Sequence, residues 1–197
     1  ISAFNFPVAV WAWNTMVAMV CGDVVIWKPS EKTPLCAIAC HNIIAGVLKK
    51  NRVPEGVCNL VIGDYKIGEY LSQDARVPLV SATGSTRMGK KVGAAVAERL
   101  GRSLLELGGN NAIIITEHAD LKMALRATLF GAAGTAGQRC TSTRRLIIKD
   151  KVYDTFKQDL INAYKHISIG HPLEQKTLVG PLIDTDAIKN FTAAVEQ

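Results

Sequence analysis

The feature that most constrains this chain is a regular alternation of short apolar runs with longer stretches that carry apolar residues at helical spacing. The first run, Val24–Trp27, ends at a Lys-Pro-Ser turn, and Thr33-Pro34 then opens a helical stretch that continues to about Lys50. Short apolar runs are typical of buried parallel strands, and the stretches between them are typical of the helices that cover such a sheet. The alternation therefore predicts an α/β fold built on parallel sheet.

The same alternation continues toward the end of the chain. It predicts further strands over residues 57–61, 77–81, 103–107, 112–115 and 145–149, and further helices near 67–71 and over 86–99, 120–133 and 152–166. Gly101 is expected to cap the helix before the strand 103–107, because glycine adopts the left-handed backbone of a helix end at little cost.

The longest apolar run is Phe6–Cys21, which contains Asn14 and Thr15. It is shorter than the roughly 20 apolar residues that a membrane-spanning helix needs. The run therefore predicts a buried helix, and we expect no membrane partner.

The sequence also indicates where one domain ends and the next begins. Two strand-like runs meet at residues 107–111 with no helix between them, and a Gly-Gly pair lies there. We therefore expect one domain over residues 1–109 and a second over residues 110–197. The chain starts at Ile1 inside a motif-like segment and ends in a helical pattern, so we expect it to be a piece of a longer protein.

The charge of the chain permits a polyanionic partner without requiring one. Lys and Arg total 23 against 17 Asp and Glu, a net charge of +6. The interleaved aromatic and basic residues that are typical of nucleic-acid surfaces are absent. We therefore expect no nucleic-acid partner.

The cysteines argue against both a disulfide framework and a metal site. The chain has five cysteines at irregular spacings, and we expect no signal peptide, so we expect a reducing compartment. Cys36, Cys40 and His41 could be imagined as metal ligands, but they lie in an apolar helical pattern without the paired ligand spacing of a zinc site. We expect a cytoplasmic protein without a metal, or a mitochondrial matrix protein if the source is eukaryotic.

Cys140 is the first candidate for chemistry. A stretch of small residues, 131–137, precedes it and lets other groups approach the backbone closely. Arg139 and local amide dipoles favour the thiolate, which is the reactive form of cysteine. The alternative is a small buried hydrophobe, the usual state of a free cysteine.

Two further residues could take part in base or oxyanion chemistry. Glu106 ends an apolar strand, where a carboxylate loses hydration and becomes a stronger base, although it could instead cap the next element. Asn5 lies between Phe4 and Phe6-Pro7, and its amide is a neutral donor suited to a developing oxyanion. The alternative for Asn5 is a turn residue.

Features that bind phosphate are present but dispersed. Lys28 and Glu31 directly follow a strand, so Lys28 could meet phosphate or ribose hydroxyls and Glu31 could accept a hydrogen bond from a ribose. The Gly-x-Gly-x-x-Gly fingerprint of dinucleotide-binding folds is absent. Several glycines open or line helix starts, where phosphates bind: Gly63, Gly68, Gly84 and Gly89.

Five segments, taken in order, resemble the aldehyde dehydrogenase superfamily over essentially the whole chain. They are Phe4-Asn5-Phe6-Pro7, residues 24–34 with Trp27-Lys28-Pro29-Ser30-Glu31, Thr83-Gly84-Ser85-Thr86, Leu105-Glu106-Leu107-Gly108-Gly109 and Gly137-Gln138-Arg139-Cys140. Within the superfamily, segments 108–114 and 134–141 look like the antiquitin branch, whose members oxidise α-aminoadipic semialdehyde. The resemblance implies a Rossmann-like, parallel-sheet NAD-binding domain over 1–109, lacking its N-terminal strands, and the first part of an α/β catalytic domain over 110–197.

The resemblance also implies roles for the candidate residues. Cys140 is the nucleophile, Asn5 and the Cys140 backbone N–H hold the oxyanion, and Glu106 is the base for hydrolysis. Arg139 could pair with the carboxylate of an anionic semialdehyde, or it could anchor the loop or activate Cys140. The expected cofactor is NAD, held by Ile1, Phe4, Lys28, Ser30, Glu31, Gly63, Gly68, Thr83, Gly84, Ser85, Met88, Leu107 and Gly108.

The implied function is NAD-dependent oxidation of an aldehyde in lysine catabolism, through a thiohemiacetal and a thioester, by a homodimer or homotetramer. A CoA-acylating semialdehyde dehydrogenase is an alternative, but thiol transfer does not need the Glu106 base. A non-catalytic relative is another alternative, and the intact Cys140, Glu106 and Asn5 argue against it. The family's Glu-x-Phe segment and oligomerisation strand are absent from this chain. We expect the isolated chain to be poorly soluble or inactive, because its sheet edges and the interface to the missing segments would be exposed.

Overall fold

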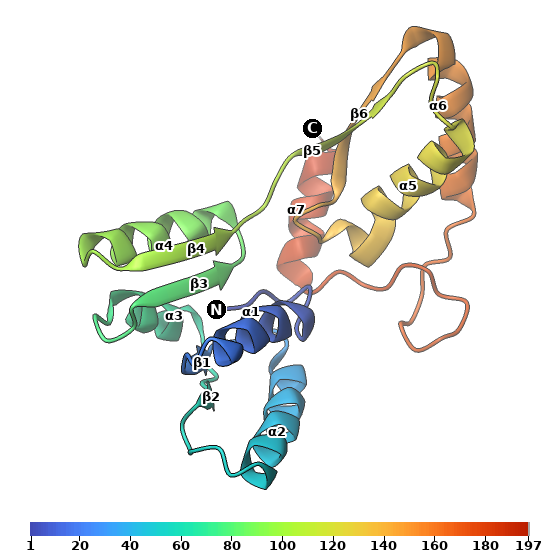
Figure 1. Cartoon of the computed structure of the whole chain (residues 1–197). Helices are drawn as coiled ribbons and strands as arrows, with labels where there is room; N and C mark the ends of the chain where they lie inside the picture. The colour runs from blue at the N-terminus through green and yellow to red at the C-terminus, as the bar shows by residue number, and fades with distance from the viewer. Residues whose placement is uncertain (197) are drawn as a thin grey trace. The chain divides into compact units, whose positions relative to one another are not determined.

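The computed structural model describes residues 1–196 and divides into two compact units, Ile1–Leu107 and the chain from Gly108 onward (Figure 1). Each unit combines helices with parallel strand pairs. The predicted α/β class with parallel sheet is confirmed. The division falls between Leu107 and Gly108, two residues before the boundary after Gly109 that the sequence predicts.

The first unit contains two pairs of parallel strands. Within each pair an α-helix lies between the first strand and the second, which is the kind of connection that parallel strands require. The pairs are β1 (Val25–Trp27) with β2 (Cys58–Leu60), and β3 (Leu79–Thr83) with β4 (Arg102–Glu106).

The first two residues of the chain connect these two pairs. The Ile1 nitrogen donates to the Ser81 carbonyl (2.8 Å), and the Ile1 carbonyl accepts from the Thr83 N–H (3.1 Å), which is the bonding pattern of parallel strands. Ser2 donates its N–H to the Lys28 carbonyl directly after β1 (3.0 Å). The ends of β1 and β3 are therefore held on either side of the same short segment.

The helices of the first unit cover these strands in two apolar clusters. In one cluster the rings of Trp11 and Trp27 stack with their centroids 4.5 Å apart, next to the buried Ala37. The other cluster packs α4 on β3 and is made by Val80, Ala82, Val92 and Val96. The helices are α1 (Ala9–Val20), α2 (Pro34–Lys50), α3 (Tyr65–Gln73) and α4 (Thr86–Glu98).

Helix α1 differs from the buried helix predicted over Phe6–Cys21. It buries only Trp11 and Thr15, which lie one turn apart, and leaves Val20 88% exposed. The prediction of a buried helix is therefore wrong, because α1 covers the sheet with a single stripe. None of the helices in the described part of the chain has both the length and the hydropathy that a bilayer crossing needs.

Strand β3 begins two residues later than predicted. Pro78 precedes it and has no N–H to contribute to a ladder, although its carbonyl accepts from the Arg102 N–H (3.0 Å). The strand therefore starts at Leu79 and ends at Thr83 rather than at Ser81.

The end of α4 also differs from the prediction that Gly101 caps it. Leu100, not Gly101, adopts the left-handed backbone, with φ 57°, and its side chain is 94% exposed. The Gly101 N–H donates to Val96 and the Leu100 N–H donates to Ala97, both at 2.9 Å. This pair of bonds is a Schellman motif with a leucine where glycine is preferred.

The second unit is built on one parallel strand pair. Strands β5 and β6 run side by side with a register shift near Asn111, and Ile115 and Phe156 are its most deeply buried large apolar side chains. The elements are β5 (Asn111–Ile115), α5 (Leu121–Ala133), the 3-10 turn η1 (Gly134–Gly137), β6 (Thr143–Ile148), α6 (Asp150–Lys165) and α7 (Thr185–Val195).

The left-handed Leu100 gives a test of the fold. Replacing Leu100 with Gly should raise the free energy of unfolding by about 0.5–1 kcal/mol, because it removes the Cβ clash of the left-handed region. Leu100→Ala removes the same exposed side chain but keeps the Cβ, so it should bring no such gain. Equilibrium urea unfolding measures both variants, and equal effects would contradict the role given to the backbone conformation.

Candidate active site

The parallel pairing brings the predicted cofactor residues of the first unit to one edge of its strands. Thr83 and Glu106 are partners at the last register position of β3 and β4, and the Gly84 N–H donates to the Glu106 carbonyl (3.0 Å). Lys28 directly follows β1. Backbone hydrogen bonds of Ile1 to β3 and of Ser2 to Lys28 connect the end of β1 to β3. Ligands of open parallel sheets bind at this carboxyl edge.

Lys28 and Glu31 form an ion pair directly after β1. The Lys28 side chain is 5% exposed, and its Nζ lies 3.1 Å from Oε2 of Glu31, which is half exposed. Partial burial works to raise the pKa of Glu31, but a backbone hydrogen bond, the Lys28 hydrogen bond and charge, and the Lys32 charge together lower it below its usual value. The pair offers one buried ammonium and one accessible carboxylate acceptor at this edge.

Ser85 begins α4 immediately after β3. Its Oγ accepts from the Met88 N–H (3.1 Å), so Ser85 is the N-cap of the helix, and its side chain is exposed. The first-turn N–H groups of a helix attract anions, because they are aligned and lack partners within the helix. A pyrophosphate is the kind of group that this helix start could hold.

Three other predicted positions lie around the same strands. Phe4 is partly buried, with the Lys32 Nζ 5.5 Å from its ring centroid. Gly63 lies just before α3, and Gly68 lies within it, where an added Cβ would come 3.7 Å from Cδ1 of Ile1. Their part in holding a cofactor stays a prediction.

The remaining predicted positions are partly explained by packing. A Cβ added at Gly89 would lie 2.4 Å from the Leu107 side chain, so this leucine fits closely against α4. Met88 packs against the apolar cluster of β3 and α4, and Ser30 accepts from the Lys32 N–H (3.3 Å). Gly108 is exposed.

Glu106 lies at the end of a strand and Asn5 lies in a turn, as the sequence predicts. The expectation that the Glu106 carboxylate loses hydration is wrong. Glu106 is the last residue of β4 and its side chain is exposed, so it has not lost hydration in this structure. The physical reason is that, within residues 1–196, β4 pairs with β3 alone, and four of its five residues are exposed. Asn5 is partly buried in the turn before α1, which fits the turn alternative.

Cys140 is exposed at a tight turn between η1 and β6. The Ser142 N–H donates to the Arg139 carbonyl (3.2 Å), and the Arg139 N–H donates to Oγ of Ser142 (3.1 Å). Ser142 is only 2% exposed, so it anchors the turn in the second unit. The side-chain amide of Asn111 donates to the carbonyls of Cys140 (2.7 Å) and Ser142 (3.2 Å).

The segment before Cys140 has an unusual backbone. Thr135, Ala136 and Gly137 have φ values of 56°, 52° and 70°, which is the left-handed region for three consecutive residues. The Arg139 Nε donates to Oγ1 of Thr135 (2.8 Å), and its guanidinium lies 4.6 Å from the Phe130 ring centroid. These contacts fit the alternative in which Arg139 anchors the loop, and its role toward a substrate stays a prediction.

The other cysteines offer less for nucleophilic chemistry. Burial raises the pKa of the Cys58 thiol, and Cys36 and Cys40 are partly buried in α2. Cys21 is exposed, but it is the C-cap of α1, where the Gly22 N–H donates to the Met19 carbonyl (3.1 Å) and closes the end of the helix. Among residues 1–196, no group of His, Cys, Asp and Glu side chains is placed to hold a metal ion.

Sequence reasoning missed three residues that shape the Cys140 turn. Asn111 and Ser142 bind the turn directly, and Phe130 stacks on Arg139. The place of Asn111 could have been predicted if the pairing of β5 with β6 were known, because the first residue of β5 then lies beside the residues just before β6. The alternation of strand-like and helical segments in the sequence does not show which strands pair.

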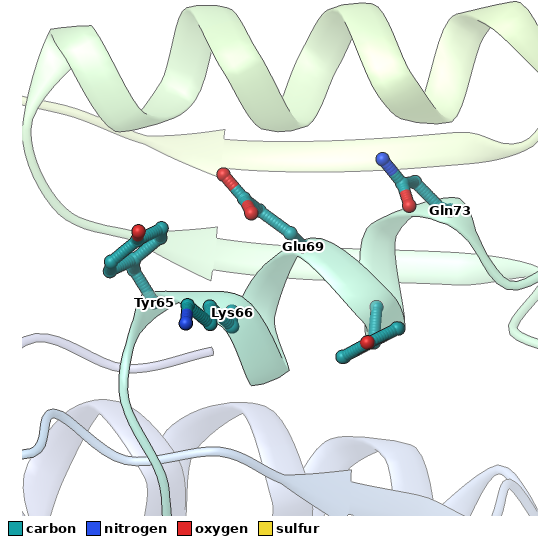
Figure 2. Close-up of a pocket in the computed structure, with 5 residues that line it drawn as sticks. Tyr65, Lys66, Glu69 and Gln73 are labelled. Carbon is teal, nitrogen blue, oxygen red and sulfur yellow. The ribbon is translucent and has the colours of Figure 1, made fainter.

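A pocket lies on α3, the helix that also contains the predicted cofactor residue Gly68 (Figure 2). Its lining consists of polar and aromatic side chains one helical turn apart: Tyr65, Lys66, Glu69, Tyr70 and Gln73. None of the five lining residues is a predicted site residue, and Cys140 is not among them, so this pocket does not mark the candidate active site.

Comparison with known proteins settles the family. The model of the aldehyde dehydrogenase family matches residues 1–197. The chain belongs to this family. The membership confirms the resemblance that the five ordered segments indicate.

Curated relatives of this aldehyde dehydrogenase chain confirm the likeness to the antiquitin branch. It is 48% identical to aldehyde dehydrogenase family 7 member B4 of Arabidopsis thaliana, and 48% identical to the alpha-aminoadipic semialdehyde dehydrogenase of Bos taurus, over its whole length. The matched region is 39% and 36% of those two proteins. The chain thus spans less than half the length of the curated relatives it matches.

Solved aldehyde dehydrogenase structures confirm the Rossmann-like fold. Betaine aldehyde dehydrogenase from Staphylococcus aureus in complex with NAD+ superposes with a TM-score of 0.92 at 31% identity, over 99% of this chain and 38% of that one. Glyceraldehyde-3-phosphate dehydrogenase from Methanocaldococcus jannaschii, complexed with NADP, gives a TM-score of 0.94 at 33% identity, over 99% and 43%.

The ion pair after β1 predicts a pH-dependent stability. Replacing Glu31 with Gln should lower the free energy of unfolding by about 0.5–1 kcal/mol at neutral pH, the value of a partly exposed pair. Because the folded pKa of Glu31 is lowered, this advantage of the wild type is present above the usual glutamate pKa of about 4.3 and is lost as pH falls through the folded value. Urea unfolding at neutral pH and near pH 3 measures it.

The exposed Glu55 supplies the control for this measurement. Glu55→Gln should leave the stability unchanged within error at both pH values. A deficit of Glu31→Gln that persists unchanged near pH 3 would show that the loss does not come from the ion pair.

Proposed function

We propose that the protein to which this chain belongs oxidises an aldehyde to a carboxylic acid with NAD, through a thioester on Cys140. The observation that carries the proposal is the exposed Cys140 on a hydrogen-bonded turn in a chain of the aldehyde dehydrogenase family. A thiol that is both accessible and fixed by its main chain is suited to nucleophilic attack.

The carboxyl edge of the first unit fits a dinucleotide. Ser85 and the first turn of α4 would hold the pyrophosphate, and the Lys28–Glu31 pair would meet the ribose hydroxyls. Relatives of known structure include complexes with NAD+ and with NADP. The Glu31 carboxylate favours NAD in this chain, because it would repel a 2′-phosphate.

The chain's own residues supply the nucleophile, the oxyanion donors and the base of the proposed reaction. The Cys140 thiolate adds to the aldehyde carbon, while Asn5 and the Cys140 N–H stabilise the oxyanion of the thiohemiacetal. Bound NAD supplies the hydride acceptor for the oxidation. Glu106 then takes a proton from water, which attacks the resulting thioester and releases the acid and the thiol.

The presence of Glu106 supports hydrolysis over the CoA-acylating alternative. Hydrolysis needs a base to take a proton from the attacking water, whereas transfer of the acyl group to a thiol has no need of that base. The presence of Cys140, Glu106 and Asn5 disfavours the non-catalytic alternative. Together they supply the nucleophile, the base and the oxyanion donor that the reaction needs.

We propose α-aminoadipic semialdehyde as the substrate and lysine breakdown as the pathway. Support comes from curated relatives of that name, such as the Bos taurus and Rattus norvegicus proteins, both 48% identical to this chain. Stacking on Phe130 holds the Arg139 guanidinium in place, which reduces the entropy that is lost when a substrate carboxylate pairs with it. A purely anchoring Arg139 remains the alternative.

The proposal extends to location and assembly. A cytoplasmic homodimer or homotetramer, or a mitochondrial matrix enzyme in a eukaryote, suits a protein with five free cysteines. Exposed apolar residues on α2, including Leu35 and Ile43 at 78% and 70%, support association with other protein surfaces.

The nucleophile assignment predicts the behaviour of two cysteine variants. Cys140→Ala in the full-length protein should abolish oxidation of every aldehyde while leaving the Kd for NAD within about twofold, because the thiol acts in chemistry and not in cofactor recognition. Cys21→Ala, which removes another exposed thiol, should retain full activity. Turnover by Cys140→Ala would reject the assignment.

The substrate assignment predicts a selective effect of Arg139. Arg139→Ala should cost about 2–4 kcal/mol in kcat/KM for α-aminoadipic semialdehyde but little for the neutral aldehyde hexanal, because only the first has a carboxylate to lose its partner. Arg126→Ala, an exposed arginine on α5, is the matched control. Equal losses on both aldehydes would show that Arg139 anchors the loop instead.

A further inference from the structure

We propose that Asn111 is a positioning residue that holds the main chain of Cys140 in its reactive conformation. The inference rests on the proposed function, since it concerns the same nucleophile. Asn111 is the first residue of β5, and its amide Nδ2 donates to two carbonyls of the Cys140 turn, at 2.7 Å to Cys140 and 3.2 Å to Ser142.

The contacts fix the turn on both sides of the nucleophile. The reciprocal bonds between Arg139 and Ser142 close the turn around Cys140 and hold the N–H side of the nucleophile. Asn111 holds the carbonyl side through Cys140 and Ser142 together. The main chain of Cys140 is thus restrained while its side chain stays exposed, which is the combination that an attacking thiolate needs.

The chemistry of the side chain explains why an asparagine suits this position. Its planar amide presents two N–H groups from one nitrogen, so one residue can serve two carbonyl acceptors. Aspartate has nearly the same shape but offers only acceptors when ionised, and alanine offers neither. The two carbonyls therefore require the amide and not merely the volume of the side chain.

Gly109 leaves the space that the Asn111 amide occupies. A Cβ added at Gly109 would lie 2.8 Å from Oδ1 of Asn111 and 3.3 Å from its Nδ2. An alanine there would displace the amide without changing its chemistry. The structure thus supplies a second, independent way to disturb the same two hydrogen bonds.

The test compares Asn111→Ala, Asn111→Asp and Gly109→Ala with Asn110→Ala in the full-length protein. Asn110 is the exposed neighbour of Asn111, so it is the matched control. The first readout is amide hydrogen exchange of the peptide covering residues 139–143. Exchange should rise about tenfold in the first three variants and stay at the wild-type rate in Asn110→Ala, because only these three disturb the turn.

The second readout is chemistry at Cys140. The rate constant of the first NADH burst should fall about 10- to 100-fold in the first three variants, with the KM for NAD unchanged, since a misplaced nucleophile slows attack without weakening the cofactor. Alkylation of Cys140 by iodoacetamide should stay within about threefold of the wild type, because the thiol remains exposed. A purely structural Asn111 would lower the yield of folded protein without changing the burst per alkylatable Cys140.

Two results would overturn the positioning role. One is unchanged hydrogen exchange in the Asn111 variants, and the other is faster exchange with an unchanged burst. A wild-type protein that shows no burst with any aldehyde contradicts the proposed function instead. The exchange comparison between Asn111→Ala and Asn110→Ala then decides by itself whether Asn111 holds the turn.

Discussion

The parallel register of the strand pairs is the constraint on which the placement of the candidate residues depends. In the first unit, Thr83 and Glu106 are opposite each other because β3 and β4 end together. In the second unit, the start of β5 lies beside the start of β6, so Asn111 reaches the carbonyl of Cys140 before β6 begins. The candidate cofactor residues of the first unit thus follow the C-terminal ends of parallel strands, whereas Cys140 in the second unit lies just before the N-terminal end of one.

Much of this arrangement could be predicted from the sequence, because each element carries its own local signal. Helix α2 starts at Pro34 and ends at Lys50 as its pattern predicts, since proline is favoured in a first helical turn. The burial of α1 could not be predicted in this way, because apolar content does not say which face meets a neighbour. The cap at Leu100 was missed because glycine is only a preference at helix ends, and the adjacent Gly101 satisfies the sequence rule equally well.

In the candidate site too, features set by neighbouring residues in the sequence could be predicted, and features set by tertiary packing could not. Cys140 stands out by its small-residue surroundings, and its exposure in the structure agrees with a reachable thiol. The expected loss of hydration at Glu106 is absent, because it depends on what covers β4 and not on the apolar residues next to it in sequence. The contacts of Asn111 and of Arg139 with Phe130 are likewise products of tertiary packing.

The most direct test of the account is to trap the acyl group on the full-length protein. Glu106→Gln should remove the base for hydrolysis, so mixing it with NAD and α-aminoadipic semialdehyde should leave about one acyl group per active site on the peptide that carries Cys140, detected by mass spectrometry. The wild type should accumulate little, because hydrolysis clears the thioester. The absence of an acyl adduct on Cys140 in the variant, or its presence on Cys21, would contradict the proposed mechanism.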